Sequence, residues 1–368
     1  MSALRSVVLA GGGTGGHVYP LLAFADCLRR HDPTVTITCL GTAKGLENEL
    51  IPPAGYPLRR IPAHQLPRAV NLDLAKTPAR MWRAARAAGA VLDEVGAQAV
   101  VGFGGYVAVP AYLAAWKREL PIVVHEVNVP PGVANRLAMK ITKNVAVGFP
   151  HQLAQSELLA GARLVGVPLR RQISGLDRAA SRAEARAHFG LDPDRPTLFV
   201  SGGSQGARSI NLAVTGAAKQ LSRAGVQVLH VIGARNEPVE PPADLSTPYV
   251  TVPYLAEMEL GYAAGDLMLA RGGALTCAEL AAVGMPAVYV PYPHHNREQY
   301  RNARPVVEAG GGLLVDDAEL TPAWIEAELI PLITAPARLA TMGSAAGAYG
   351  RRDGDEALRA FLLESVRW

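Results

Sequence analysis

The sequence predicts an α/β protein that contains two Rossmann-like domains, each built around a parallel β-sheet. The chain has 368 residues, which is more than a single hydrophobic core usually serves. Short apolar runs rich in β-branched residues alternate with longer alanine-rich amphipathic segments, and this alternation is typical of βαβ units. A glycine-rich loop follows the first apolar run of each half, at residues 11–16 and again at residues 202–206. We therefore expect two domains with the same arrangement of alternating strands and helices and a glycine-rich loop after the first strand.

Ten apolar runs are predicted to be strands, because continuous apolar runs suit strands that are buried on both faces of a parallel sheet. The first half contributes SVVLA, VTITCLG, AVVGFGG, IVVHEVN and VAVGF, and the second half contributes TLFVSGG, VQVLHVIG, YVTVPY, DLMLARGG and AVYVPY. The alternation is interrupted at Pro168, and the basic stretch after it predicts a solvent-facing helix. We expect domains at residues 1–167 and 168–344, and a C-terminal helix at about 345–368 that packs back on the first domain.

The composition is that of an ordered globular protein, with 49% hydrophobic and 18% charged residues. A net charge of +4 does not indicate a uniformly basic surface, so no nucleic-acid partner is expected. Cys27, Cys39 and Cys277 lie far apart without CxxC spacing, which predicts buried free thiols rather than disulfides or a zinc site. The apolar run at the N-terminus is too short for a signal peptide, and no run approaches a membrane span. We expect a soluble cytoplasmic protein.

The first glycine loop, residues 11–16, has the G-x-G-x-x-G spacing of dinucleotide-binding proteins and follows a predicted strand. An NAD site also needs an acidic residue at the end of the second strand to bind the ribose. Here that strand ends in Gly41 and Thr42, and the first acid is Glu47, so the expected partner is missing. No Gly-Lys-Ser/Thr follows either glycine loop, which excludes a P-loop. Glycine can also serve a sharp turn without any ligand.

Four further strand ends carry small or polar residues, at 102–106, 125–128, 201–206 and 271–276. In doubly wound sheets such ends line the ligand-binding crevice. In the stretch GGSQGARSIN, the N–H groups and the dipole at the start of a helix favour a phosphate. Two such sheets facing each other would form a deep cleft with glycine-lined walls from both domains.

The segment at residues 266–303 is the most informative part of the chain. A helix is expected to begin at Ala274, after two glycines, and Glu279 falls about one turn in. An acid there can accept hydrogen bonds from a ribose diol; the alternative is that it only complements the helix dipole. Arg271 and the polar cluster at residues 294–299 accompany it and favour the binding function.

Seven stretches carry a resemblance to a known family, in the order that the family has them. They are GGGTGGHVYPLLA, VGFGGYVAVPA, HEVNVPPGVANR, GVPLR, SGGSQGARSIN, RGGALTCAELAAVGMPA and REQYRNA. The chain resembles the UDP-N-acetylglucosamine:lipid I N-acetylglucosaminyltransferases of bacterial peptidoglycan synthesis, which are glycosyltransferases of the GT-B fold. The resemblance covers most of the chain and implies that the second domain binds UDP-GlcNAc while the first receives lipid I.

The resemblance also implies roles for individual residues, with UDP-GlcNAc as donor and no obligatory cofactor or metal. Ser204, Gln205 and their loop would hold the diphosphate with Arg170 nearby, and Leu255 would meet the uracil through its backbone. The other implied donor contacts are Thr14, Gly15, Gly16, Asn128, Arg271, Ala274, Leu275, Thr276, Cys277, Ala278, Glu279 at the ribose hydroxyls, and Gln299 at the GlcNAc. The implied acceptor contacts are Thr14, His17, Tyr106, His125 and Glu126.

The chain departs from the family pattern at three places. The family usually reads HEQN, whereas Val127 stands at the third position here. A glutamine pair is common where this chain has Glu298 and Gln299, and the stretch at residues 291–295 is looser than the pattern. These departures concern recognition of the donor's hydroxyls, and they leave the fold expectation unchanged.

The reaction that the resemblance implies is a direct displacement with inversion at the anomeric carbon. The leaving diphosphate needs stabilisation, which preorganised N–H donors can supply, and no DxD-like metal motif follows a strand. The attacking hydroxyl needs a base. His17 is the histidine of the glycine loop and our first candidate, with Asn128 facing the sugar; His125 and Glu126 compete for the role of base. Alternatively, His17 only shapes its loop.

A polyprenyl substrate implies contact with the cytoplasmic face of the cell membrane. Thr77 and Pro78 are predicted to begin a helix that carries arginines beside Met81 and Trp82. Further basic and aromatic residues occur at 116–118 and 136–144. Basic residues beside apolar ones suit an anionic leaflet. The alternative is that Trp82 packs in the core and the arginines form a solvated face. Other cell-wall synthesis proteins are further candidate partners.

Three alternatives remain open from the sequence. One is another GT-B enzyme, such as a diacylglycerol glycosyltransferase or a UDP-GlcNAc 2-epimerase. A Rossmann dehydrogenase is disfavoured by the missing acid after the second strand. An inactive homologue that only binds a UDP-sugar is disfavoured by the presence of His17, Asn128, Glu279 and Gln299 together.

Overall fold

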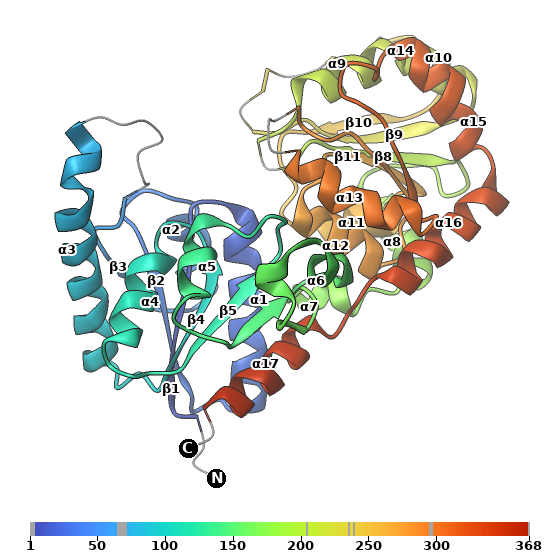
Figure 1. Cartoon of the computed structure of the whole chain (residues 1–368). Coiled ribbons are helices and arrows are strands. Elements are labelled where there is room, and N and C mark those ends of the chain that lie inside the picture. The colour runs from blue at the N-terminus through green and yellow to red at the C-terminus, as the bar shows by residue number, and fades with distance from the viewer. Residues whose placement is uncertain are drawn as a thin grey trace. The chain divides into compact units, whose positions relative to one another are not determined.

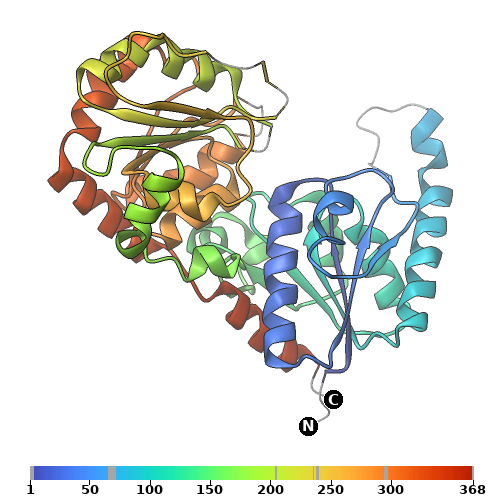
Figure 2. The same cartoon turned by 180° about the vertical axis from the view of Figure 1, so that it is seen from behind.

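The computed structural model describes residues 4–64, 72–203, 205–234, 236–237, 240–293 and 297–366. Ser204 and the histidines at 294 and 295, which the sequence singled out, lie outside the described residues. The chain divides into two compact units: Met1–Arg170 together with Asp353–Trp368, and Arg171–Arg352. Figures 1 and 2 show both units from opposite sides.

Within the described residues, the first unit holds a seven-stranded parallel sheet of order β3-β2-β1-β4-β5-β6-β7. The strands are β1 (Ser6–Gly11), β2 (Thr36–Gly41), β3 (Leu58–Arg60), β4 (Ala99–Gly104), β5 (Ile122–Glu126), β6 (Val145–Val147) and β7 (Arg163–Leu164). The helices are α1 (Gly15–His31), α2 (Glu47–Leu50), α3 (Leu72–Glu94), α4 (Ala108–Trp116), α5 (Val133–Ala138), α6 (Pro150–Gln155), η1 (Glu157–Leu159) and α17 (Gly354–Ser365).

Helices cover both faces of this sheet, which is why its strands read as continuous apolar runs. Val8 and Ala10 of β1 pack in the core under α3, α4 and α5, whereas Val7 and Leu9 pack in the core under α1 and α17. Residues that alternate along one strand thus fill two different layers. Figure 1 shows α3 and α4 on one side of the strands and α1 on the other.

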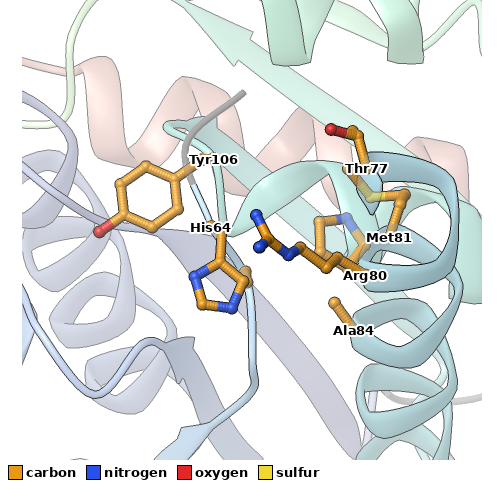
Figure 3. Close-up of a pocket in the computed structure, with 8 residues that line it drawn as sticks. His64, Thr77, Arg80, Met81, Ala84 and Tyr106 are labelled. Carbon is orange, nitrogen blue, oxygen red and sulfur yellow. The ribbon is translucent and has the colours of Figure 1, made fainter. Parts of the chain in front are cut away.

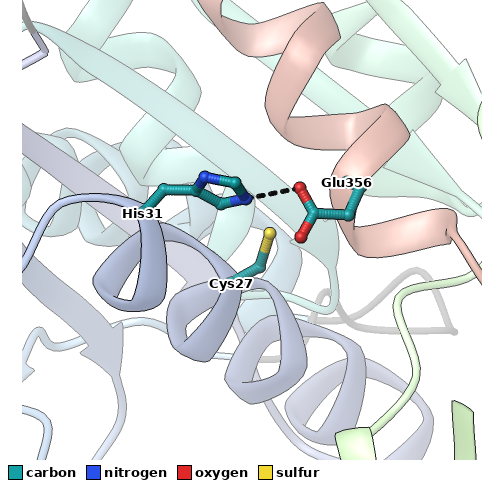
Figure 4. A group of neighbouring side chains, drawn as sticks. All are labelled: Cys27, His31 and Glu356. Carbon is teal, nitrogen blue, oxygen red and sulfur yellow. Dashed lines mark hydrogen bonds and ion pairs between the residues drawn. The ribbon is translucent and has the colours of Figure 1, made fainter. Parts of the chain in front are cut away.

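Helix α17 comes from the C-terminus and is fastened to α1 by charged side chains. His31 Nε2 lies 2.7 Å from Glu356 Oε2, beside the thiol of Cys27 (Figure 4). Arg30 bonds both Asp355, at 2.8 Å, and Glu356, at 3.1 Å. These ion pairs add to the apolar contact between the two helices, in which Leu358 and Leu362 of α17 pack in the same core as α1.

Among the described residues, the second unit holds a six-stranded parallel sheet of order β10-β9-β8-β11-β12-β13. The strands are β8 (Thr197–Ser201), β9 (Gln227–Val231), β10 (Tyr249–Val252), β11 (Leu267–Ala270), β12 (Ala287–Tyr289) and β13 (Gly312–Leu314). The helices are α7 (Arg171–Ser174), α8 (Arg178–His188), α9 (Arg208–Gly216), α10 (Ala218–Arg223), α11 (Met258–Ala264), α12 (Ala274–Ala282), α13 (Glu298–Glu308), α14 (Pro322–Trp324), the π-helical η2 (Ile325–Leu329), α15 (Ile330–Ile333) and α16 (Pro336–Tyr349).

One local prediction is wrong and another needs refinement. The helix expected to begin at Thr77 and Pro78 begins at Leu72 instead, so Pro78 lies inside α3 and removes one N–H···O bond from its second turn. The helix expected to face solvent is α8, and most of its residues are exposed, whereas Arg186 is 1% exposed and bonds Asp266, the residue before β11, at 2.8 Å. Its arginines thus anchor α8 to the sheet.

The three cysteines are free and buried, as predicted. In the part of the chain that the structure describes, no helix has the length and apolar character that crossing a membrane requires.

Candidate functional site

The strand order reverses once in each sheet, and the glycine loops lie at these two points. Strand β1 has β2 on one side and β4 on the other, and β8 lies in the same way between β9 and β11. Because all the strands are parallel, their carboxyl ends meet at one edge of each sheet. Ligands of doubly wound folds bind outside the carboxyl ends at such a reversal. The two loops therefore mark one candidate half-site in each unit.

The glycine loop after β8 is held tightly by the loop after β9. A side chain on Gly206, which has φ +70°, would lie 2.1 Å from the Ile232 carbonyl oxygen, so only glycine fits there. Asn236 Nδ2 donates to the carbonyls of Gln205 and Ile232 at 2.9 and 3.0 Å. On Gly203, by contrast, an added Cβ would meet no atom of the described residues within 4 Å. The loop is fixed from one side and open at Gly203.

Helices α9 and α12 begin at this edge without a capping side chain. The N-cap residue of α9 is Ala207 and that of α12 is Gly273, and neither has a polar side chain. Helix α8 differs, because the side chain of Asp177 accepts hydrogen bonds from its first N–H groups. Within the described residues, the first-turn N–H groups of α9 and α12 are thus left for an external acceptor. A phosphate suits both the N–H groups and the helix dipole.

Glu279 is the sixth residue of α12, so it lies just beyond the first turn, where the helix dipole acts more weakly. Its side chain is 5% exposed, and its Oε2 accepts a hydrogen bond of 2.5 Å from the hydroxyl of Tyr262 in α11. An oriented, buried carboxylate is a strong acceptor for a diol. Its neighbours Cys277 and Ala278 are buried, and burial raises the pKa of the Cys277 thiol.

The guanidinium of Arg271 bonds protein groups from three segments. Its Nη2 donates to Ser209 Oγ of α9 at 2.9 Å, its Nη1 donates to the Val290 carbonyl at 3.0 Å, and Nη1 also pairs with Asp317. Arg271 therefore ties the ends of β11 and β12 to the start of α9, the helix that follows the glycine loop.

The other predicted donor residues follow the same strand ends. Gln299 lies in the first turn of α13, where its Oε1 accepts from Tyr292 N at 2.8 Å. An added Cβ on Gly272 would lie 2.5 Å from the Gln299 carbonyl oxygen, so this close approach requires glycine. Leu255 follows β10, and Ala274, Leu275 and Thr276 form the first turn of α12. The fold thus brings the described donor residues of this unit to one edge.

In the first unit, His17 is fixed by the glycine loop. Its Nδ1 lies 3.2 Å from the Gly12 carbonyl oxygen and 3.3 Å from Thr14 Oγ1. A carbonyl only accepts, so Nδ1 carries the proton and Nε2 is left to accept one. Burial lowers the pKa of His17, and the Gly12 carbonyl and Glu47 partly oppose this. An added Cβ on Gly104 would lie 3.0 Å from Nε2, so glycine there makes room for the ring.

A carboxylate of the protein itself fills the anion-binding position of this first loop. Glu47 is fully buried; its Oε2 accepts from Gly13 N at 2.9 Å, and its Oε1 accepts from Thr42 N and Oγ1 at 3.0 and 2.9 Å. The sequence showed Glu47 only as an acid that comes too late for a ribose partner. Its contact with Gly13 spans 34 residues, which no local pattern reveals.

The competing base candidates are engaged in structural bonds. His125 is 1% exposed, lies 2.8 Å from the Gly166 carbonyl oxygen, and has its pKa lowered to about 4 by burial. Glu126 accepts from the N–H groups of Val127, Asn128 and Gly132 and from the Asn135 side chain, at 2.8–3.0 Å. It shapes the loop that carries Asn128.

Two more predicted residues border this edge. The hydroxyl of Tyr106 donates to the Lys44 carbonyl at 3.1 Å, and the Arg170 guanidinium stacks 4.8 Å from the Tyr19 ring centroid of α1. Thr14 caps the start of α1 by position, followed by Gly15 and Gly16. Beside Tyr106 lies a pocket into which His64 and Arg80 extend (Figure 3). It is lined by Ala63, His64, Thr77, Arg80, Met81, Ala84, Tyr106 and Pro110.

Comparison with known proteins identifies the family. The glycosyltransferase family 28 N-terminal domain matches residues 7–147, and the C-terminal domain of that family matches residues 197–358. The chain belongs to glycosyltransferase family 28. The prediction of a GT-B glycosyltransferase is confirmed.

Relatives within family 28 match this chain along its whole length. Two are UDP-N-acetylglucosamine--N-acetylmuramyl-(pentapeptide) pyrophosphoryl-undecaprenol N-acetylglucosamine transferases. The one from Streptomyces avermitilis is 54% identical over 98% of each chain, and the one from a Nocardioides species is 55% identical over 97% of each. The crystal structure of MurG from Acinetobacter baumannii matches with a TM-score of 0.75 at 26% identity, covering 98% of this chain and 99% of that one. A UDP-GlcNAc 2-epimerase from Neisseria meningitidis, at 14% identity and TM-score 0.68, shares the fold alone.

Proposed function

We propose that this chain transfers GlcNAc from UDP-GlcNAc to the 4-hydroxyl of the muramyl sugar of lipid I, and so forms lipid II for peptidoglycan. The observation that carries this proposal is the identity of 54–55% to transferases of that activity over 97–98% of the chain. The rival 2-epimerase activity has only a fold likeness in its favour. The missing ribose acid after β2, where Glu47 instead bonds Gly13, speaks against a dehydrogenase.

The second unit holds the donor in this proposal. The diphosphate sits against the glycine loop after β8 and the uncapped starts of α9 and α12, and the ribose hydroxyls donate to Glu279. Arg271 acts by tying these segments together, since its guanidinium bonds Ser209, Val290 and Asp317. The N–H groups stabilise the charge that develops on the leaving UDP.

The first unit supplies the base. The acceptor hydroxyl forms a bond to the anomeric carbon, the bond from that carbon to the phosphate oxygen breaks, and its electron pair leaves with UDP. The hydroxyl proton passes to Nε2 of His17, which is neutral because burial lowers the pKa of the ring. His125 and Glu126 hold backbone groups and are therefore weaker candidates. The pocket beside Tyr106, with Arg80 and His64 in it, offers a place for an anionic part of the acceptor.

The first unit also reaches the membrane in this proposal. Trp82 of α3 is 63% exposed and Trp116 of α4 is 58% exposed, so the alternative that Trp82 packs in the core is wrong. Exposed cations accompany them, among them Arg83 on α3 and Lys117 after α4. Arg118 contributes less, because it forms an ion pair of 2.6 Å with Asp93. Exposed indoles beside cations suit the anionic cytoplasmic leaflet.

The proposed activity is tested by incubating the protein with UDP-GlcNAc and a short-chain lipid I analogue, with and without EDTA, and with UDP-GalNAc as the control donor. We expect a disaccharide product from UDP-GlcNAc, little product from UDP-GalNAc, and the same rate with EDTA. Absence of any disaccharide while UDP still binds would remove the transferase and leave a nucleotide-binding protein.

A further inference from the structure

One peptide group of the first glycine loop lies between a buried carboxylate and the imidazole of His17. The N–H of Gly13 donates to Glu47 Oε2 at 2.9 Å, and the C=O of Gly12 lies 3.2 Å from His17 Nδ1. This N–H and this C=O belong to the same amide plane. The hydrogen bonds therefore run in series from the carboxylate, through one peptide, to the ring.

The surroundings of Glu47 are built to hold its carboxylate at this position. Added side chains on Gly41 and Gly45 would lie 2.7 Å from Cγ and 2.2 Å from Oε2 of Glu47, so only glycine leaves room for the carboxyl group. Thr42 donates its N–H to Oε1 at 3.0 Å, and its hydroxyl lies 2.9 Å from Oε1 and 2.8 Å from the Lys44 carbonyl oxygen, which share its single proton. The carboxylate thus accepts from backbone N–H groups of two loops, Gly13 and Thr42, and it cannot turn without leaving one of them unsatisfied.

A carboxylate in this place affects His17 in two ways. It polarises the peptide, which makes the Gly12 carbonyl a better acceptor for Nδ1–H and favours the tautomer with a free Nε2. It also opposes the effect of burial on the pKa of His17. Among the described residues, Nε2 has no hydrogen-bond partner, so it is the atom that can receive a proton.

We propose that Glu47 is a positioning residue that acts through the Gly12–Gly13 peptide to fix the tautomer and orientation of His17. This inference rests on the proposed function for the part that concerns catalysis, while the part that concerns the tautomer stands without it. In this proposal the anion that accepts from the N–H of the first glycine loop is the carboxylate of Glu47, whereas the loop after β8 is left to bind the diphosphate of the donor.

The decisive experiment is a double-mutant cycle with Glu47→Gln and His17→Ala. A glutamine keeps the shape, but its NH₂ group must face a backbone N–H of either Gly13 or Thr42. We expect Glu47→Gln to lower kcat by about tenfold, which is less than the roughly 10²–10⁴-fold loss expected when a general base is removed outright, and to leave both KM values within about twofold. In the His17→Ala background, Glu47→Gln should cause no further loss. Glu49→Gln, on the exposed side of α2, is the matched control and should retain full activity.

An equal loss in both backgrounds would overturn the proposal, because it would mean that Glu47 acts on the fold and not through His17. Thermal unfolding of each variant shows whether the variant folds. A second measurement needs neither a variant nor a substrate: two-bond ¹H–¹⁵N correlations of the wild-type imidazole report its tautomer. The Nδ1–H tautomer supports the proposal, and the Nε2–H tautomer overturns it. If the wild-type protein makes no disaccharide, the proposed function fails while this tautomer test still decides the role of Glu47.

Discussion

The contact between Glu279 and the donor ribose gives the sharpest test of donor recognition. Glu279 is 5% exposed and is oriented by the Tyr262 hydroxyl at 2.5 Å. A hydrogen bond to a charged group contributes about 1.5–3 kcal/mol, and each 1.4 kcal/mol corresponds to a factor of ten. Glu279→Gln keeps the volume and removes the charge. We therefore expect the Kd for UDP to rise by about 10- to 150-fold, measured by titration calorimetry.

A comparison of two ligands separates the ribose contact from damage to the fold. Wild-type protein should bind 2′-deoxy-UDP about tenfold or more weakly than UDP, because one hydroxyl donor to the carboxylate is lost. The Glu279→Gln variant should bind the two ligands with similar affinity. The matched control is Tyr262→Phe, which removes the hydroxyl that orients the carboxylate but keeps the carboxylate. This variant should still prefer UDP.

The reasoning would be refuted if Glu279→Gln still discriminated between UDP and 2′-deoxy-UDP as strongly as the wild type. The carboxylate of Glu279 would then serve only as the buried hydrogen-bond acceptor of the Tyr262 hydroxyl. A weaker affinity for both ligands with the discrimination preserved would lead to the same conclusion, since a general loosening of α12 affects both equally.

Two further predictions concern the membrane and acid stability. Replacing Trp82 and Trp116 by alanine should weaken cosedimentation with anionic vesicles by about tenfold or more, while turnover of a water-soluble acceptor stays unchanged; unchanged sedimentation would rule out this surface. His125 and His230 are buried and neutral, and their pKa values are lowered from 6.5 to about 4, so the unfolded chain binds more protons between these values. The free energy of unfolding should therefore be highest above pH 6.5 and fall towards pH 4, by about 2 kcal/mol per histidine at pH 5. Urea unfolding measures this free energy, and an equal value at pH 7.5 and pH 5 would contradict the prediction.

The sequence predicted the central strands and one edge strand, β10, and missed the other three edge strands. All ten predicted apolar runs contain strands, whereas β3, β7 and β13 were not predicted. These three lie at sheet edges, where a strand has a single neighbour, and each of them is only two or three residues long. Strands β3 and β7 also contain arginines, at positions 59, 60 and 163, so no apolar run marks them in the sequence. Because an edge strand is specified by its single partner, its own residues carry little signal.

The candidate site was predictable where it depends on position along the chain, and unpredictable where it depends on tertiary partners. Glycines at strand ends mark the two loops, since parallel strands bring their carboxyl ends to one edge. That Arg271 bonds Ser209 and Asp317 could not be read from the sequence, because 62 and 46 residues separate them. The role of Glu47 was hidden for the same reason.

The two glycine loops have the same place in their sheets, and what distinguishes them is the residue that the second strand of each sheet delivers. After β2 this residue is Glu47, whose carboxylate accepts from the loop N–H of Gly13. After β9 it is Asn236, whose amide instead donates to the carbonyls of Gln205 and Ile232. A carboxylate occupies N–H groups that a phosphate would need, whereas an amide donor leaves them available.

This difference leads to a last prediction, for Asn236→Asp. The aspartate has nearly the same shape, cannot donate to the two carbonyls, and places a negative charge beside the open loop. Like charges in contact cost several kcal/mol, so UDP binding should weaken by about tenfold or more, while binding of uridine, which lacks phosphate, should change little. Titration calorimetry with UDP and with uridine measures the two affinities. Equal weakening for uridine and UDP would mean that the substitution only disturbs the loop, and that the choice between Glu47 and Asn236 does not decide which loop receives the diphosphate.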